Sequence, residues 1–421
     1  MPDQYLRTIR HFNRDIHLYL FASGLVGFCL FSGIYSLLFN LYLLRLGYGP
    51  AFVGQVNAVG GLAFALSSLP SSFLGSRWGN RRTMILGLSL AVVGHALLSQ
   101  AEFVPTIHQQ NFILSMNSLG LLGISLYIVN GYPYLMKISS AAQRHHVFSL
   151  QAALFPLAGF AGSLVGGFLP GGFASLLQLS LDHPAPYRHT LLCASLLLTP
   201  GVFALVATGQ ETRREHQGDT STDAAPLPLK LILIISFIAF LYTASEGAVR
   251  TFLNVYLDDA LNASTALIGT LAASGQLLAT PAALMMPFLV RRFGRTRTFN
   301  GAVLCSALIL VPLALIPHWA IAGLCLMGTM CLAGIRRPAF TVFQQEMMPL
   351  RWRTAMAGAA ATMTGFGYAG VSLGGGYVIE AVGYRALFLM AGCLTASGAV
   401  IFWLCFRHRD DDAGEPNSLL S

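Results

Sequence analysis

The chain has 421 residues, of which 55% are hydrophobic and only 10% are Asp, Glu, Lys or Arg. Soluble proteins carry about 25% charged residues. This composition, with a mean hydropathy of +0.63, therefore excludes a water-soluble fold and indicates repeated membrane spans. The formal net charge of +8 does not indicate nucleic-acid binding, because the basic residues are scattered over short polar breaks and form no basic domain.

Apolar runs of about 20 residues, the length that crosses the hydrocarbon layer of a bilayer, recur along the chain. In chain order the predicted spans are 16–44, 51–73, 83–101, 110–136, 147–171, 189–208, 230–257, 265–290, 299–317, 319–343, 355–379 and 386–406. The first run lacks a small-residue cleavage site, so we interpret it as a retained helix and not as a signal peptide. We therefore predict an all-α polytopic membrane protein with twelve transmembrane helices.

The basic residues predict the orientation, because short cytoplasmic loops carry an excess of Lys and Arg. With both termini in the cytoplasm, the basic clusters fall in the N-terminal arm and after the second and eighth spans: Arg7, Arg10, Arg14; Arg77, Arg81, Arg82; Arg291, Arg292, Arg295, Arg297. The opposite loops hold only Arg45, Arg188 and Arg385. We expect a multi-pass protein of the cell or inner membrane with both termini in the cytoplasm.

A polar stretch at 209–228, GQETRREHQGDTSTDAAPLP, divides the spans into two sets of six. Its content of charge, Thr, Ala and Pro is typical of a linker between folded units. We predict an N-terminal six-helix bundle at 1–208, a cytoplasmic linker at 209–228, a C-terminal six-helix bundle at 229–407 and a cytoplasmic tail at 408–421.

The two sets of spans also repeat each other in sequence. Four residues of the first span recur 214 positions later in the seventh: Gly33, Asn40, Tyr42 and Leu43 match Gly247, Asn254, Tyr256 and Leu257. The loop RWGNRRT at 77–83 recurs as RFGRTRT at 292–298, and A-G-x-x-x-G-G at 161–167 returns at 369–375. Three matches in one order at nearly one offset indicate a duplication, and an offset of six spans makes the halves parallel repeats.

The duplicated loops resemble the signature loop of the major facilitator superfamily, G-x-x-x-D-R-x-G-R-R. The first copy matches at Arg77, Gly79 and Arg81, and it has Ser72, Ser76 and Asn80 where the family usually has Gly, Asp and Arg. The second copy keeps Arg292, Gly294 and Arg295, with Arg291 in place of the acid. Together with twelve spans and a central linker, the resemblance covers the whole chain. It implies the fold of that superfamily and a role as a secondary transporter.

The resemblance also implies a gating role for these loops, because the family's acidic residue latches one state by pairing with charges on neighbouring helices. The candidate gating residues are Arg77, Gly79, Arg81, Arg82, Arg292, Gly294 and Arg295. Without the acid, we expect this latch to be weaker or built differently. The alternative is that the arginines serve only as topology anchors, at the ends of helices and near anionic lipid.

Glu246 lies well inside the seventh predicted span, and Arg250 follows it by one helical turn. A charge at this depth costs at least ~2.5 kcal/mol, so ionisable residues inside spans are functional candidates. The resemblance places the seventh helix beside the central cavity. One hypothesis is that Glu246 takes up and releases a proton as the cavity alternates, because burial favours a neutral carboxyl group and a nearby Arg favours an ionised one. The alternative is a fixed i,i+4 ion pair.

Further cavity candidates are polar residues within apolar spans. Arg336 or its neighbour Arg337 is a candidate to bind an anionic group, and the alternative, which we favour for Arg337, is snorkelling to the interface. The uncharged candidates are Tyr35, Asn57, Asn130, Tyr132, Gln276 and Tyr368. Such residues are more often interhelical hydrogen-bonding groups than ligand contacts. The repeat-related Asn40 and Asn254 are expected to be structural.

The function predicted from these features is secondary active transport of a small organic solute by alternating access, coupled to protons. A passive facilitator on the same fold is the first alternative, and a non-transporting membrane sensor or a membrane-embedded enzyme comes after it. We expect no cofactor and no metal, because the seven cysteines lack ligand spacing and the chain has no P-loop. The expected partners are a small-molecule substrate and the lipid bilayer, with no nucleic acid, and we expect a monomer.

Overall fold

The computed structural model describes residues 12–140, 143–209, 228–349 and 352–407, and the regular elements in these ranges are helices. The N-half, as we call it, contains α2 Arg14–Cys29, α3 Ile34–Arg45, α4 Pro50–Trp78, α5 Asn80–Leu98, η1 Ala101–Phe103, α6 Thr106–Ile138, α7 Arg144–Leu177, α8 Pro184–Leu197 and α9 Thr199–Val206. The C-half contains α10 Leu229–Val255, η2 Tyr256–Ala260, α11 Thr265–Phe293, α12 Arg295–Leu315, α13 Trp319–Glu346, α14 Arg353–Val382 and α15 Tyr384–Phe406. Most of the predicted linker and all of the predicted tail lie outside the described residues.

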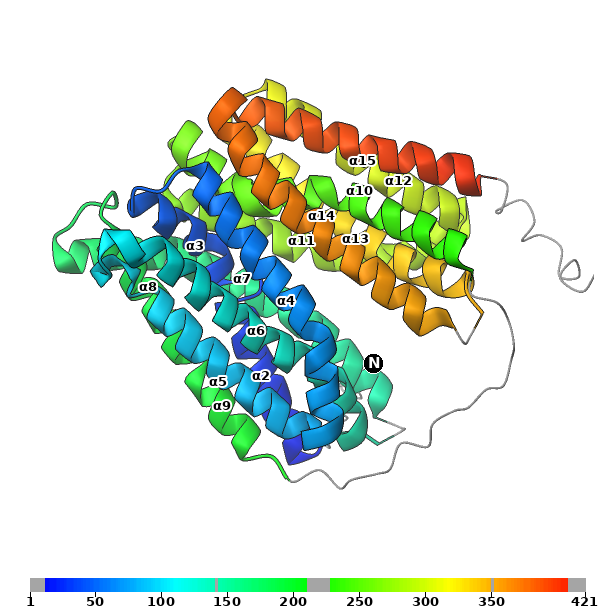
Figure 1. The fold of residues 1–421 in the computed structure, drawn as a ribbon, viewed down its shortest axis with the longest axis horizontal. Helices are drawn as coiled ribbons and strands as arrows, with labels where there is room; N and C mark the ends of the chain where they lie inside the picture. The colour runs from blue at the N-terminus through cyan, green and yellow to red at the C-terminus, as the bar shows by residue number, and fades with distance from the viewer. Residues whose placement is uncertain (1–11, 141–142, 210–227, 350–351, 408–421) are drawn as a thin grey trace, which may run out of the picture.

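The helices confirm the twelve predicted spans to within a few residues at each end. Within the described ranges, eleven stretches are long and apolar enough to cross a membrane. The twelfth, α14, has 30 residues, but its many Gly and Thr residues lower its hydropathy. It packs along α10 and α4 among the other spans (Figure 1), so composition alone understates a helix whose small residues allow close packing.

The two halves lie side by side and meet along two helix pairs, α4 with α14 and α7 with α11. Figure 1 shows both pairs converging toward the ends of α3 and α14 and the halves diverging toward the end of α9 and the start of α10. We call the converging side the far side and the diverging side the linker side. The space between the halves therefore widens in one direction.

The first span is not the single helix that the sequence predicts. It breaks at residues 30–33, between α2 and α3, and Ser32 adopts a left-handed conformation with φ of 61°. A Cβ at Gly33 would overlap the carbonyl oxygen of Phe28 within the same span, so the break itself requires glycine there. A Cβ at Gly162 would overlap the same oxygen from α7, so this helix also approaches the break closely. The Ser163 hydroxyl donates to the freed carbonyl of Ser32. The break is thus stabilised by a neighbouring helix, as broken membrane helices require.

The duplicated loops turn at glycine in the way their sequence predicts. Gly79 joins α4 to α5 with φ of 94°, and Gly294 joins α11 to α12 with φ of 83°. Both angles lie in the left-handed region, which favours a residue without a Cβ. Repeat-related residues therefore make the same reversal in both halves.

We expect Gly162→Ala to destabilise the protein by about 1–3 kcal/mol, because the added methyl group would overpack the contact between α7 and the break in the first span. Gly171→Ala is the matched control, since it lies in the same helix and has nothing within 4 Å of its Cβ position. The measurement is the apparent Tm of each purified variant in detergent. Equal Tm values for the two variants would contradict the proposed close contact.

Candidate functional site

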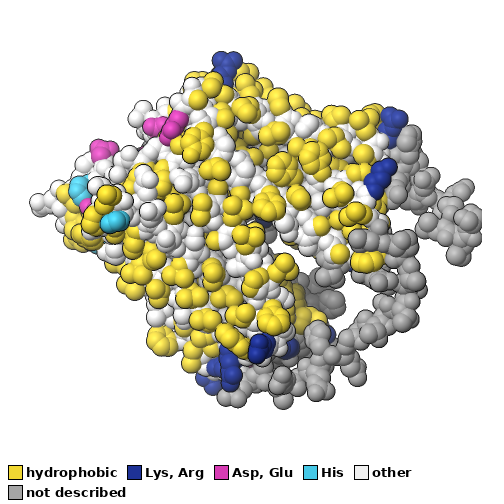
Figure 2. Space-filling view, viewed as in Figure 1, with side chains coloured by type: hydrophobic (Ala, Val, Ile, Leu, Met, Phe, Trp, Pro, Cys, Tyr) yellow, Lys and Arg dark blue, Asp and Glu magenta, His cyan; other side chains and the backbone are white. Residues whose placement is uncertain are grey.

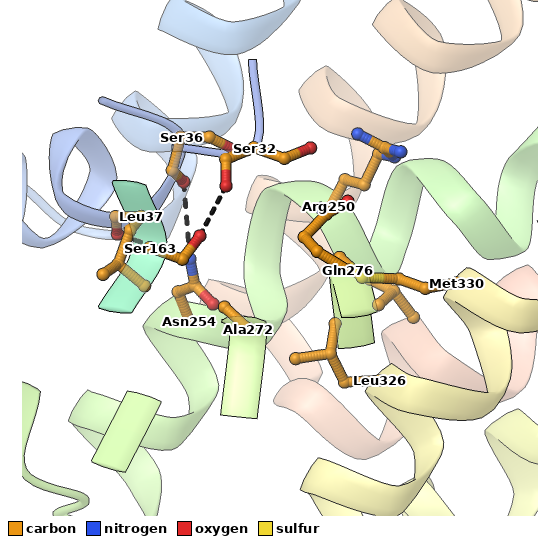
Figure 3. Close-up of a pocket in the computed structure, with 11 residues that line it drawn as sticks. Ser32, Ser36, Leu37, Ser163, Arg250, Asn254, Ala272, Gln276, Leu326 and Met330 are labelled. Carbon is orange, nitrogen blue, oxygen red and sulfur yellow. Dashed lines mark hydrogen bonds between the residues drawn. The ribbon is translucent and has the colours of Figure 1, made fainter. Parts of the chain in front are cut away.

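A pocket lies between the two halves, near the middle of their helices (Figure 3). Its polar lining comes from the break in the first span, α3, α7, α10 and α11: Ser32, Ser36, Ser163, Arg250, Asn254 and Gln276. Its empty volume, which includes open space at its mouth, is about 390 Å³. Because both halves line this pocket, a change in the angle between them would change its shape and its access.

Four charged residues meet beside this pocket, and we call them the Glu246 cluster: Glu246, Arg250, Arg336 and Arg337. The Nε group of Arg250 donates to Glu246 Oε1 at 2.8 Å, and a terminal nitrogen of Arg336 donates to Oε2 at 2.6 Å. Arg337 donates to Oε1 as well. One carboxylate on α10 therefore joins two arginines of α13 and one of its own helix.

Arg336 is the most enclosed member of the cluster, with an exposed fraction of 0%. Its guanidinium lies over the ring of Tyr242, 4.7 Å from the centroid, and its second terminal nitrogen donates to Ser306 at 3.4 Å. Its Nε has no hydrogen-bond partner in the described part of the chain. The carboxylate of Glu246 compensates the burial of this guanidinium, because a lone charge at this depth would be very costly.

The other two arginines reach toward open space. The side chain of Arg250 is 33% exposed and that of Arg337 is 59% exposed. Within the described residues, Glu246 is the acid within ion-pair distance of all three arginines. The cluster therefore carries three formal positive charges and one negative charge.

Some of the site residues predicted from the sequence lie at this pocket or in the Glu246 cluster, and others do not. The structure contains the i,i+4 pair of Glu246 with Arg250 that the sequence suggested, but the pair is part of a larger cluster. Arg337, for which snorkelling was the favoured interpretation, is exposed and also contacts Glu246. Gln276 lines the pocket between the halves.

Tyr35 and Asn57 line a second pocket, which lies within the N-half and has an empty volume of about 540 Å³. The Tyr35 hydroxyl donates to the carbonyl of His95 at 2.5 Å, and Asn57 donates to Asn40 Oδ1 at 2.9 Å. Ser36 lines both pockets, so the two adjoin at the break in the first span.

The remaining polar candidates lie away from both pockets. Asn130 is buried and donates to the carbonyls of Ser71 and Leu126, an interhelical role. Tyr132 is exposed and its ring stacks on Phe148. Tyr368 accepts a hydrogen bond from Thr251 at 3.2 Å, where α14 meets α10.

Sequence reasoning missed the serines of the site. Ser32, Ser36 and Ser163 line the pocket although their side chains carry no charge and their spans look uniformly apolar. One available signal was the Ser32-Gly33 pair, because Ser-Gly within a helical run is a turn signal. The break that it marks exposes polar groups at mid-membrane depth.

The far side is joined by polar contacts between the halves. Arg45 donates from both terminal nitrogens to the two oxygens of Asp258, each at 2.7 Å, and its Nε donates to the carbonyl of Leu181. Tyr187 bonds Thr265 at 2.9 Å. These contacts were not predicted, because they depend on the packing of the two halves against each other.

Two repeat-related asparagines add a reciprocal pair of contacts. Asn40 donates to the carbonyl of Thr251 at 2.8 Å, and Asn254 donates to the carbonyl of Leu37 at 3.3 Å. Each asparagine thus bonds the backbone of the opposite half at the equivalent helical position, since 214 positions separate both the donors and the acceptors. This is the structural use that the sequence suggested for them.

The family model of the Major Facilitator Superfamily matches residues 20–372 and again 235–419. The chain belongs to the major facilitator superfamily. It is therefore a multi-pass membrane transporter of small-molecule substrates and not an enzyme. No curated protein sequence matches the chain at a significant level.

Solved transporters of the superfamily share this fold at low sequence identity. A mutant of the nucleoside transporter NupG is 17% identical with a TM-score of 0.77, over 94% of this chain and 100% of that one. The xylose transporter XylE from E. coli, in an inward open conformation, is 13% identical with a TM-score of 0.73, over 92% and 95%. A POT family transporter in complex with 5-aminolevulinic acid is 13% identical with a TM-score of 0.74, over 96% and 97%. At these identities the likeness concerns the fold alone.

The superfamily's signature loops differ between the two halves in their contacts. In the first loop, Arg81 donates to Thr208 at 2.9 Å and to the carbonyl of Val206 at 2.5 Å, which fastens α5 to the end of α9. In the second loop, Arg295 pairs with Glu346 at the end of α13. Glu346, an acid from another helix, thus contacts the second signature loop, which has Arg291 where the family usually has an acid.

The other arginines of these loops, Arg77, Arg82 and Arg292, are exposed at the linker-side ends of the helices. Arg292 lies over the ring of Phe293, 5.5 Å from its centroid. A position at the linker-side helix ends is compatible with a topology anchor and with a gating contact, so the gating role of these three arginines stays a prediction.

We expect Glu246→Ala to lower the free energy of unfolding by about 3–5 kcal/mol, because three guanidinium groups would lose a shared buried counter-charge. Glu346→Ala is the control, since it removes the partner of an exposed arginine and should cost about 1 kcal/mol or less. The measurement is the apparent Tm in detergent. Adding Arg336→Met to Glu246→Ala should recover part of the loss, and a further loss in the double variant would contradict the charge argument.

Proposed function

We propose that the protein is a secondary transporter that carries a small organic solute across the membrane by alternating access. In this proposal the described conformation is the one in which the pocket between the halves communicates with the cytoplasm. The halves rock about the helix pairs α4–α14 and α7–α11, and the pocket then opens to the other side.

The observation that carries this proposal is the one-sided distribution of contacts between the halves. Arg45 with Asp258 and Ala51 with Glu380 join the halves on the far side. Asn40 with Thr251 and Asn254 with Leu37 join them beside the pocket. On the linker side Figure 2 reveals a hollow between the halves. A pocket closed on one side and open on the other is one of the two end states that alternating access requires.

The charges at the two ends support the cytoplasmic assignment of the linker side. Figure 2 has Lys and Arg mainly at the linker-side ends of this face, and Asp, Glu and His toward the far side. The exposed arginines of the signature loops belong to the linker side. An excess of Lys and Arg is characteristic of cytoplasmic loops, so both termini are also assigned to the cytoplasm in this proposal.

The Glu246 cluster supports proton coupling. A proton on Glu246 would remove the single negative charge that holds Arg250, Arg336 and Arg337 together. The contact between α10 and α13 would then weaken, because like charges repel strongly at low dielectric. Protonation and helix arrangement are thereby linked, and such a link is what coupled transport requires.

The first prediction of this proposal concerns the far-side ion pair. Asp258→Asn should weaken a bidentate, partly buried pair by about 2 kcal/mol or more, which shifts the ratio of the two end states more than tenfold. Nitroxide pairs in a cysteine-free background report the change by double electron–electron resonance. The Ser180–Asn262 distance on the far side should gain a longer component, and the Ser76–Ala355 distance on the linker side a shorter one.

Glu102→Gln is the matched control for this experiment. It removes a 2.7 Å ion pair with Arg188 that also lies on the far side but joins elements of the N-half alone. Its distance distributions should equal those of the parent protein. If Asp258→Asn also leaves both distances unchanged, or lengthens both together, a rocking motion about the central helix pairs is refuted.

The second prediction concerns proton coupling in proteoliposomes, with a solute identified by ligand-induced thermal stabilisation. An inward-directed proton gradient of one pH unit supplies about 1.4 kcal/mol per proton, so one-to-one coupling should accumulate a solute up to about tenfold. Glu246→Gln should abolish accumulation and retain equilibration, because the amide keeps the size of the side chain but carries no exchangeable charge. Glu102→Gln, whose ion pair with Arg188 lies within the N-half, should accumulate normally.

Accumulation by the Glu246→Gln variant would rule out the proton-carrying role of that residue. If the parent protein is a passive facilitator, it will not accumulate the solute even with a proton gradient. Its uptake would stop at the external concentration, and a protonophore would leave the uptake level of the parent protein unchanged.

A further inference from the structure

The Glu246 cluster has an unusual charge balance for the middle of a membrane. One carboxylate faces three guanidinium groups, and Glu246 is the acid that the described residues supply to them. The two guanidinium groups in excess, those of Arg250 and Arg337, are exposed to open space. Their positive charge therefore favours an anion in the space beside them.

The guanidinium N–H donors that have no partner in the cluster indicate where an anion would bind. In the described part of the chain, Arg250 uses only its Nε, and both of its terminal nitrogens lack a protein partner. Arg337 uses one terminal nitrogen. Arg250 also lines the pocket between the halves, and in Figure 3 its terminal nitrogens extend away from the neighbouring side chains of the pocket. Two parallel N–H donors of a guanidinium fit the two oxygens of a carboxylate or phosphate.

The opposite wall of the same pocket is also suited to a negative group. It includes Ser32 and Ser36, which flank the start of α3. The N-cap of α3 is Gly33, and no side chain among the described residues caps it. The amino end of a helix carries a partial positive charge, and broken membrane helices use such ends to bind anionic substrates. Because the carboxyl end of α2 lies at the same break and carries the opposite partial charge, the N-half contributes hydrogen-bond donors, the serine hydroxyls and the backbone N–H groups of α3, and Arg250 contributes the positive charge.

We propose that the pocket between the halves binds a small organic anion, whose carboxylate or phosphate group is held by the free nitrogens of Arg250. Arg337 lies outside the pocket lining but shares Glu246 Oε1 with Arg250, and it adds positive charge beside the bound anion. This inference rests on the proposed function, because it assigns a substrate class to the pocket of that transporter. Glu246 acts as the resident anion that holds the arginines when the pocket is empty. Arg336, enclosed and bonded to Glu246, is a positioning residue that keeps the carboxylate beside α13.

The test is the apparent Tm of the purified full-length protein with matched pairs of compounds at millimolar concentration. Glucose 6-phosphate is compared with glucose, and succinate with succinamide, so that each pair differs in its anionic groups. Inorganic phosphate tests whether the anion alone suffices. We expect at least one organic anion to raise the Tm while its uncharged partner does not, because a ligand that binds only the folded state stabilises it. Stabilisation by the sugar phosphate or by the dicarboxylate identifies the group.

Variants locate the binding. Arg250→Gln should weaken the stabilisation so that about tenfold or more anion is needed, the usual loss for a charge-assisted hydrogen bond. Arg250→Lys keeps the charge without the fork and should fall between the two. Arg385→Gln, an exposed far-side arginine, is the control and should bind the anion like the parent protein. If Arg250→Gln does not fold, the graded response of Arg250→Lys and Arg337→Gln carries the same comparison.

The inference is overturned if no anion raises the Tm, if uncharged partners act equally, or if Arg385→Gln loses the effect as fully as Arg250→Gln. These outcomes differ from a failure of the proposed function. An uncharged compound that shortens the Ser76–Ala355 distance would keep alternating access and remove the anionic substrate class. Binding of an anion with no change in that distance would keep the site and refute transport by rocking.

Discussion

One carboxylate at mid-membrane depth, Glu246, is the interaction on which the rest of the C-half depends. It pairs with three guanidinium groups, of which that of Arg336 is fully enclosed, where an unpaired charge costs several kcal/mol. It also fixes the rotation of α13, because Arg336 and Arg337 leave that helix at neighbouring positions and still reach the same group. Arg336 in turn packs on Tyr242, which stacks edge-on against Phe340. Electrostatics and aromatic packing therefore specify one arrangement of α10 and α13.

The duplication explains why the two walls of the pocket differ, with serines on the N-half wall and charged residues on the C-half wall. The offset of 214 positions that relates Gly33 to Gly247 also relates Ser32 to Glu246 and Ser36 to Arg250. In the N-half Ser32 lies in the break of the first span and Ser36 lies in the first turn of α3, and both line the pocket. In the C-half the helix is continuous and charged side chains occupy the same two positions. These two repeat positions thus provide two kinds of polar surface, a helix end on one wall and a charge cluster on the other.

The sequence predicts those features that depend on local chemistry. Spans follow from apolar length, and the turns at Gly79 and Gly294 follow from the need for a left-handed residue. The pair of Glu246 with Arg250 follows from helical spacing alone. The contacts of Arg336 and Arg337 with that carboxylate do not, because they require the rotation of one helix against another. Candidates chosen for polarity within a span, such as Tyr132, separate into pocket and non-pocket residues only once the neighbouring helices are in place.

The interface between the halves has two parts with different physical character. Where α7 crosses α11, a Cβ at Gly167 would lie 2.9 Å from the Cα of Gly269, so the backbones approach as closely as small residues allow. Such contacts tolerate a change of crossing angle, because few side chains interlock. Farther out, charge pairs such as Arg45 with Asp258 join the halves on the far side. In the alternating access proposed above, these groups would exchange their ion pair for water when the far side opens. An interface with few interlocking side chains and a solvent-exchangeable ion pair favours movement of the halves as rigid bodies. Under this proposal the pocket beside the α7–α11 contact would keep its residues together while its access changes sides.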